Sequence, residues 1–280
     1  MFRKCLKYDM RAISRVWWLM AFSVLGLSFV GAFTLRGVIA LTEAERFPLL
    51  IVLGALVVFA CFFAIVAAIV VVEILLYLRF YKHFFTDEGY LTFTLPVSRR
   101  TLLLSKTVNA LIWTFAQLLL TLHCVVIILL IGIPDTELAE IGYTLGWSFA
   151  FLWGEIGAWL ILYVVEILVL MVCSATFSIS LIHFCITMGA MLAKKYKLLA
   201  AVGVYYVVNM AVSLVSQILA LVFMFLIGNR LSLILETATV AVQGGIVALL
   251  LLIGCAMMAC LACTMYFIMQ TKLERNLNLA

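Results

Sequence analysis

Long apolar runs, separated by short charged segments, follow one another along the whole 280-residue chain. Each run is longer than the roughly 20 residues that an α-helix needs to cross the hydrocarbon core of a bilayer. The runs are continuous and do not alternate between apolar and polar residues, which excludes a transmembrane β-barrel. The pattern predicts six transmembrane helices, at about residues 17–41, 49–81, 101–133, 160–192, 198–227 and 241–270.

The composition agrees with this pattern. Hydrophobic residues make up 68% of the chain and charged residues 11%, whereas a soluble domain needs about a quarter of its residues charged. We therefore expect an all-α polytopic membrane protein, with residues 1–280 forming a single transmembrane domain. Most of the eight cysteines fall inside apolar runs, where they serve as packing residues, and their spacing predicts no metal site.

The basic residues are distributed unevenly between the two sides of the membrane. Six spans place both termini on one side, and 15 of the 18 Lys and Arg lie on that side. They comprise five before the first span, five between the second and third, three between the fourth and fifth, and two in the tail. Under the positive-inside rule both termini are therefore expected in the cytosol. This asymmetry also accounts for the net charge of +5, so no nucleic-acid partner is predicted.

Two segments outside the six spans call for separate interpretation. Residues 1–15 carry five cations among apolar side chains, which predicts an interfacial helix on the inner leaflet before Trp17 marks the headgroup boundary. Residues 142–159 are rich in aromatic side chains and glycine and include Glu155. This second segment could begin a very long fourth span, or form a separate re-entrant or interfacial piece.

A charged, turn-rich segment separates the second span from the third. Thr86 is a favourable N-cap residue, and Asp87 and Glu88 place negative charge at the positive end of a helix. Pro96 disfavours helical geometry in the residue before it. The sequence therefore predicts a short helix over 86–95. Its apolar side chains are Tyr90, Leu91, Phe93 and Leu95.

A new helix is predicted directly after the proline. Ser98 can cap its first turn, and Arg99, Arg100 and Lys106 are expected to anchor it at the inner headgroups. The short helix before the proline could simply rest on lipid, as amphipathic loops often do. Its acidic first turn argues against an anionic lipid surface as its resting place.

The order of residues from Thr86 to Lys106 resembles that in permease subunits of ATP-binding-cassette transporters of the second export class. The shared pattern is an acidic pair, then Gly-Tyr-Leu, then Leu-Pro-Val-Ser-Arg, and finally Leu-Leu-Leu-Ser-Lys opening a span. The six-span layout and the basic N-terminal segment extend this resemblance to the whole chain. The short permeases of Gram-positive bacteria are particularly similar, and these often export peptides or antimicrobial compounds.

The resemblance implies that residues 86–95 form a coupling helix, which docks in a groove of a separate ATPase subunit. The coupling residues it implies are Asp87, Glu88, Tyr90, Leu91, Phe93, Leu95 and Pro96. The chain has no G-x-x-x-x-G-K-[ST] loop, so no enzyme activity is expected of it. ATP and magnesium would bind to the partner ATPase. A second permease copy, identical or related, is expected beside the chain in a bacterial cell membrane.

Polar side chains within the spans are candidates for lining a transport pathway, because they are costly in lipid and usually face protein or water. Glu73 is expected to reach Arg79 or inner water, which makes Glu166 the stronger candidate. Polar patches on the third and fifth spans more often join helices than bind a substrate. The pathway candidates are Glu166, Glu73, Gln117, Asn209 and Gln217.

Two other classes of function fit the same sequence. An ion- or proton-coupled secondary carrier would use Glu73 and Glu166 as titrating groups and need no ATPase. The sequence shows no duplicated halves with broken helices, the usual sign of such carriers. An intramembrane enzyme or assembly factor is the third class. His123 and His183 have no carboxylate at a local spacing that would support it.

Overall fold

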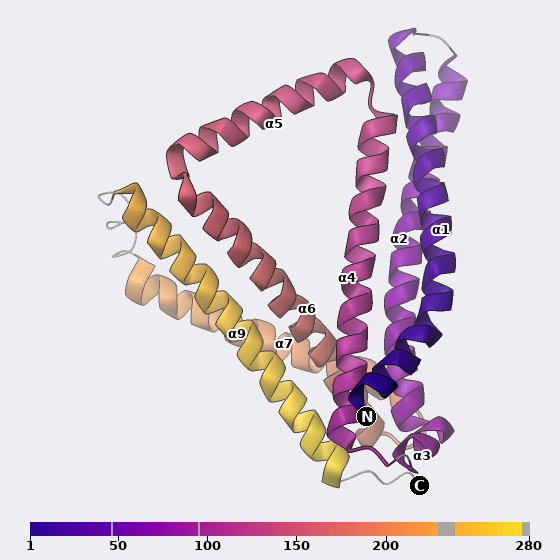
Figure 1. The fold of residues 1–280 in the computed structure, drawn as a ribbon, viewed down its shortest axis with the longest axis vertical. Helices are drawn as coiled ribbons and strands as arrows, with labels where there is room; N and C mark the ends of the chain where they lie inside the picture. The colour runs from indigo at the N-terminus through magenta and orange to yellow at the C-terminus, as the bar shows by residue number, and fades with distance from the viewer. Residues whose placement is uncertain (46, 95, 229–238, 276–280) are drawn as a thin grey trace. The chain divides into compact units, whose positions relative to one another are not determined.

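The computed structural model describes residues 1–45, 47–94, 96–228 and 239–275, which are helical almost throughout and include no strand (Figure 1). The elements are α1 (Phe2–Glu43), α2 (Pro48–Phe85), α3 (Asp87–Thr94), α4 (Arg99–Gly132), α5 (Asp135–Ile156), α6 (Ala158–Leu192), α7 (Lys197–Phe223), the π-helical turn η1 (Met224–Gly228) and α9 (Val240–Arg275). The basic residues before Trp17 belong to the same helix as the first span, and the first turns of α1 lean away from the rest of its axis (Figure 1).

Six helices in the described part of the chain are long and apolar enough to cross a membrane. They are α1, α2, α4, α6, α7 with η1, and α9. Most of their apolar side chains point outward, as expected where lipid surrounds the protein. The prediction of an all-α polytopic membrane protein is confirmed.

The chain divides into two compact units. Unit 1 comprises Met1–Arg79 and Leu104–Phe149, and unit 2 comprises Phe80–Leu103 and Ala150–Ala280. The boundaries fall inside α2, α4 and α5. The ends of α2 and α4 that flank α3 therefore belong to unit 2, while the remainder of both helices belongs to unit 1.

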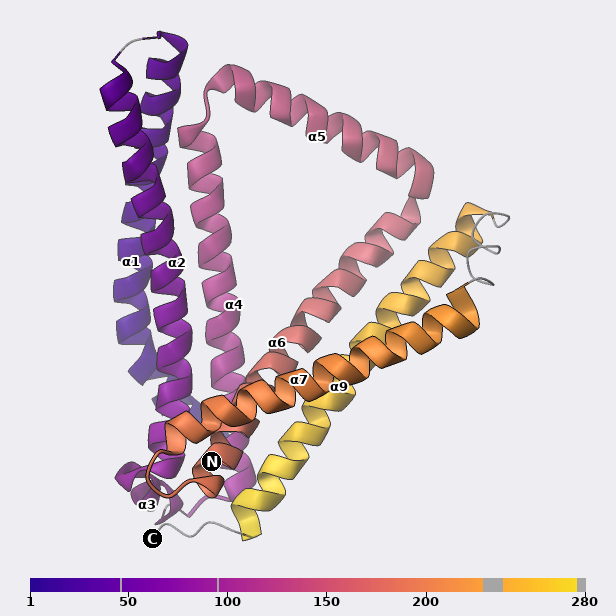
Figure 2. The same ribbon diagram turned by 180° about the vertical axis from the view of Figure 1, so that it is seen from behind.

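In unit 1, α1, α2 and α4 run side by side (Figures 1 and 2). Small residues permit the close approach, as is usual between membrane helices. A Cβ added at Gly31 of α1 would lie 3.3 Å from Cβ of Cys61 on α2, and one at Gly132 of α4 would lie 3.3 Å from the carbonyl oxygen of Ala32. The buried residues at the centre of this unit are Ala21, Val24, Ile65, Leu120 and Cys124.

In unit 2, α6 packs against both α7 and α9. Gly189 of α6 lies so close to Ala201 of α7 that any side chain there would overlap the Ala201 backbone. Toward the other end of α6, the Tyr163 hydroxyl donates a hydrogen bond to the carbonyl of Gly244 on α9 over 3.1 Å. The ring of Trp159 covers the same glycine, with its nearest atom 2.8 Å from the position of a Cβ there.

A sharp break at Gly157 separates α5 from α6. Its φ of +46° and ψ of −122° are accessible to glycine and strained for other residues. The Gly157 amide donates to the Trp153 carbonyl over 2.9 Å, and its own carbonyl accepts from the Leu160 amide over 3.1 Å. Residues 142–159, for which the sequence allows two forms, therefore belong to two helices, and the fourth span does not extend through them.

The tight α6–α7 contact predicts opposite effects for two glycine substitutions in unit 2. Gly189→Ala should destabilise the protein by about 1–3 kcal/mol, because an overpacked contact must open. Gly203→Ala has open space around it, and should be neutral or stabilise by about 0.5–1 kcal/mol because alanine restricts the unfolded chain. Thermal unfolding in detergent measures both. Equal melting temperatures would contradict the close approach.

Candidate functional site

Residues at both ends of α3 determine where the helix begins and ends. Asp87 and Glu88 occupy its first turn, as predicted. The Thr86 hydroxyl, predicted as its N-cap, instead donates to the Lys82 carbonyl over 2.6 Å and closes the last turn of α2. The helix ends at Thr94 and Pro96 follows, while Leu95 lies outside the described residues.

The next helix is capped as the sequence predicts. The Ser98 side-chain oxygen accepts a hydrogen bond from the Thr101 amide over 3.4 Å and lies 2.8 Å from the Thr101 hydroxyl. Such a cap satisfies one of the free amides in the first turn of α4. The described part of the α2–α4 connection therefore contains one short helix, and a capped helix start follows it.

The two sides of α3 have different surroundings. Tyr90 and Leu91 are 65% and 68% exposed, and Asp87 and Glu88 are exposed beside them. We call these four residues the outer face of α3. Gly89 is buried against the end of α2, where a Cβ would lie 2.8 Å from the Phe84 carbonyl oxygen.

Phe93, one of the predicted coupling residues, points to the opposite side. Its ring lies 5.6 Å from that of Phe84 at an angle of 65°, and the Arg99 guanidinium lies 5.5 Å from its ring centroid. Edge-to-face ring contacts of this kind stabilise beyond the area that they bury. Phe93 thus holds α3 to its own chain, so it belongs to a different part of the site from Tyr90 and Leu91.

An aromatic cluster connects the end of α2 to α6. Phe80 stacks on the His183 ring with 3.9 Å between centroids and 13° between planes, and the Phe84 ring lies 5.0 Å from that of Phe80. Phe80, Phe84 and His183 are almost completely buried. Together with Phe93 we call them the aromatic anchor. Sequence reasoning treated His183 as a packed residue but missed its partner. The sequence signal for this cluster was the spacing of four residues between Phe80 and Phe84, which places both rings on one face of α2.

Polar contacts connect the same segment to α7 and α9. Lys197, at the start of α7, donates to the Phe85 carbonyl over 3.4 Å. Arg99 donates to the carbonyls of Leu273 (2.5 Å) and Glu274 (3.1 Å) in the last turn of α9, where carbonyls lack partners within the helix. The Arg100 side chain pairs with the Glu274 carboxylate over 3.2 Å. The expectation that Arg99 anchors α4 at the headgroups is wrong, because its partners are protein groups; Arg100 is paired but 68% exposed, and for it the expectation stays a prediction.

Lys106 was also expected at the headgroups, and the structure contradicts this as well. The ammonium group is buried in unit 1 and pairs with Asp9 of α1, which is 5% exposed. A buried charge of this kind needs a close opposite charge to offset the loss of its hydration. The pair fixes the N-terminal basic segment to the beginning of the third span.

Two of the predicted pathway residues hold helices together within unit 1. Glu73 of α2 accepts a hydrogen bond from Thr114 of α4 over 3.3 Å, and Tyr77 is a second partner. The expected contact between Glu73 and Arg79 is not formed. Gln117 of α4 accepts from the Trp17 indole of α1 over 3.2 Å. Each polar group therefore satisfies a partner across a helix–helix contact.

The remaining pathway candidates lie in unit 2 and do not form a common site there. Glu166 of α6 is 4% exposed, and its Oε2 atom has no hydrogen-bond partner within the described ranges. Asn209 is exposed on α7, as is Gln217, which donates to the Ser213 hydroxyl over 3.3 Å. No described contact joins Glu166 to either amide.

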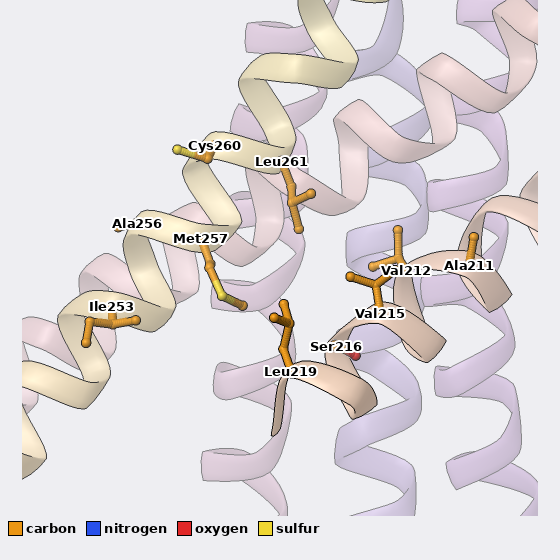
Figure 3. A pocket seen from close by; sticks show the side chains of 10 residues that line it. All are labelled: Ala211, Val212, Val215, Ser216, Leu219, Ile253, Ala256, Met257, Cys260 and Leu261. Carbon is orange, nitrogen blue, oxygen red and sulfur yellow. The ribbon is translucent and has the colours of Figure 1, made fainter. Parts of the chain in front are cut away.

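An apolar cleft of about 600 Å³ lies between α7 and α9 (Figure 3). Leu219 of α7 and Met257 of α9 extend toward each other across it, and Ser216 contributes a hydroxyl to a lining that is otherwise aliphatic or sulfur-containing. The lining carries no charge. The cleft can therefore accommodate aliphatic groups but has no means of orienting an ion.

Side chains that could bind a metal ion do not gather in the described part of the chain. No three His, Cys, Asp or Glu side chains there could hold a metal ion. The Nδ1 atom of His123 lies 2.7 Å from the Leu119 carbonyl oxygen one turn earlier in its own helix. Comparison with protein-family models, with curated proteins and with solved structures finds no match to this chain.

Adjacent arginines at the start of α4 provide a test of these contacts. Arg99→Met should destabilise the protein by about 1.5–3 kcal/mol, because two carbonyls at the end of α9 lose a charged donor. Arg100→Met removes only an exposed ion pair and should cost less than about 1 kcal/mol. Both changes are read from thermal unfolding in detergent, and equal effects would refute the capping role of Arg99.

The buried pair in unit 1 predicts a non-additive result. Asp9→Asn or Lys106→Met alone should each destabilise the protein by about 3–5 kcal/mol, because each change removes one partner of the buried pair. The double variant should lose less stability than the two single variants lose together, since no unpaired charge remains. Unfolding midpoints of all four proteins in one detergent measure the coupling. Strict additivity would show that the two side chains do not interact.

Proposed function

We propose that this chain is the membrane-spanning permease subunit of an ATP-driven transporter, of the second export class of ATP-binding-cassette transporters. The observation that supports this best is the two-sided position of α3. Its outer face is exposed, while its other side and its flanking residues contact α6, α7 and α9. Such an element can receive a partner and pass on the partner's movement.

The contacts define the route by which movement would spread. A separate ATPase subunit, holding ATP and magnesium, would bind the outer face of α3 when it closes around nucleotide. The aromatic anchor would then carry the displacement to α6, Lys197 would carry it to α7, and Arg99 would carry it to α9. In the proposed mechanism this chain converts closure of the ATPase into motion of helices and performs no chemistry itself.

A second permease copy completes the proposed assembly. Asn209, Ser213 and Gln217, in the middle and C-terminal half of α7, are exposed in an otherwise apolar span. Lipid offers no hydrogen-bond partners to such amides, whereas a helix of another subunit does. We expect the assembly in a bacterial cell membrane with both termini in the cytosol, as the distribution of Lys and Arg favours.

The proposed direction of transport is export, and the cargo class is a peptide, a lipid-like molecule or an antimicrobial compound. The resemblance of residues 86–106 to export permeases supports the direction. The uncharged cleft between α7 and α9 is compatible with the aliphatic part of such a cargo.

Glu166 favours a second candidate, an ion- or proton-coupled secondary carrier. A buried carboxyl with one oxygen unsatisfied by the described residues is a possible titrating site. Glu73, the other group that this candidate needs, is already bonded to Thr114. If the chain is such a carrier, vesicles that contain this chain alone should show a proton flux, and Glu166→Gln should abolish that flux. The permease requires an ATPase for any transport.

The permease hypothesis predicts that Tyr90→Asp disrupts binding of the ATPase. Affinity purification of the tagged chain from its native host should recover an ATPase with a P-loop, identified by peptide mass, and vanadate-sensitive ATP hydrolysis. Tyr90→Asp should lower the recovery about tenfold or more, because loss of an aromatic anchor at an interface typically costs roughly 2 kcal/mol or more.

Tyr196→Asp is the matched control, because Tyr196 is 66% exposed in the α6–α7 turn, outside α3. It should leave recovery of the ATPase unchanged. Two results would contradict the proposal: no P-loop ATPase is recovered with the unaltered chain, or Tyr90→Asp and Tyr196→Asp retain it equally.

A further inference from the structure

The α5 helix carries one narrow polar stripe on an otherwise apolar, aromatic and glycine-containing surface, and it has no buried residue. Its apolar residues recur at steps of three and four, which places them along one face of the helix. These residues, the apolar face of α5, are Leu138, Ile141, Leu145, Phe149, Leu152 and Ile156. A second series carries carboxyl and hydroxyl groups; each of its residues directly precedes one of the apolar face, so the two series lie about 100° apart around the helix. This acidic stripe of α5 consists of Glu137, Glu140, Thr144, Ser148 and Glu155.

Crossing the membrane would suit this helix poorly. A crossing α5 would expose the acidic stripe to lipid, where carboxylates are costly. It would also reverse the orientation of every later span, which would move the basic α6–α7 turn and the C-terminal tail to the outside. The 15 to 3 distribution of Lys and Arg would then become 11 to 7. The positive-inside rule therefore favours an α5 that does not cross.

Both ends of α5 are held at the membrane boundary by the spans that they join. Only Ile133 and Pro134 separate α4 from α5, and the single break at Gly157 separates α5 from α6. At the first end, Arg36 of α1 pairs with Asp135 over 3.2 Å. A helix that connects two spans on one side, and does not cross, is confined to that surface.

We propose that α5 lies flat on the outer leaflet, with its apolar face in the lipid and its acidic stripe facing the external water. Trp153 borders the apolar face, whereas Tyr143 and Trp147 lie on the opposite side of the helix; a helix at the membrane surface keeps all three near headgroup depth, which Trp and Tyr favour. Tyr143, Trp147 and Trp153 are 77%, 62% and 47% exposed. The partner of this surface is the lipid itself. The inference rests on the proposed topology and does not depend on an ATPase.

The test is a cysteine scan of residues 138–149 in the full-length chain, with the eight native cysteines replaced by alanine and the protein reconstituted in vesicles of phosphatidylcholine and phosphatidylglycerol. One arm measures labelling by a membrane-impermeant maleimide added outside. The other attaches a fluorophore at each cysteine and measures quenching by lipids with a nitroxide near the headgroup. Glu140→Cys with Leu138→Cys, and Thr144→Cys with Phe149→Cys, are matched pairs from opposite faces.

We expect both labelling and quenching to vary along the scan with the period of a helix, with their maxima about 100° apart. The stripe positions should be labelled several-fold faster, and the apolar positions quenched several-fold more strongly. Protection of all positions, with quenching only by nitroxides deep in the bilayer, would show that α5 crosses the membrane and would overturn the inference. Apolar positions that resist both reagents would indicate a protein partner, and uniform labelling would place α5 in water. Both of these last two results would also overturn the proposed position of α5, whether or not an ATPase is recovered with the chain.

Discussion

The attachment of the α2–α4 connection to the ends of α6, α7 and α9 is the constraint on which the proposed mechanism depends. Without it, α3 would be a short surface helix whose movement ended in its own loop. Stacking of Phe80 on His183 attaches the connection to α6, the hydrogen bond from Lys197 to the Phe85 carbonyl attaches it to α7, and the hydrogen bonds from Arg99 attach it to the end of α9. Since α2 and α4 continue into unit 1, both units share helices with this one segment.

Solvation by lipid explains how polar side chains are used elsewhere in the protein. Within the apolar helices a polar group stabilises only where it meets another, and several do so across helix contacts. Asp9 meets Lys106, Thr114 meets Glu73, and Trp17 meets Gln117. These groups join α1, α2 and α4, so they are better explained as structural contacts than as a transport pathway. Glu166 and Asn109 each keep one buried side-chain oxygen without a hydrogen-bond partner among the described residues.

Hydrophobic run length was enough to predict the spans, and helix-terminus signals were enough to predict α3, since both are local properties. The partners of charged residues were harder to predict from the sequence, because they are contacts between residues distant in the chain. Lys106 and Asp9 are 97 residues apart, and Arg99 and Leu273 are 174 apart. A cation near a span boundary suits a headgroup equally well when its neighbours are unknown. The break at Gly157 was likewise hidden, since its reason is a backbone conformation and glycine also occurs inside helices of this chain.

The most direct test of the central claim is a distance between α3 and the end of α9 during nucleotide turnover. Spin labels at Thr94→Cys, which is exposed in α3 outside its outer face, and at Lys272→Cys, in a chain without its native cysteines, allow this distance to be measured by double electron–electron resonance. If the segment moves together with α9, the distribution should be narrow and should keep its mean when the ATPase and ATP are added. A broad distribution, or a mean that shifts on ATP binding, would show that α3 moves independently and would contradict the account.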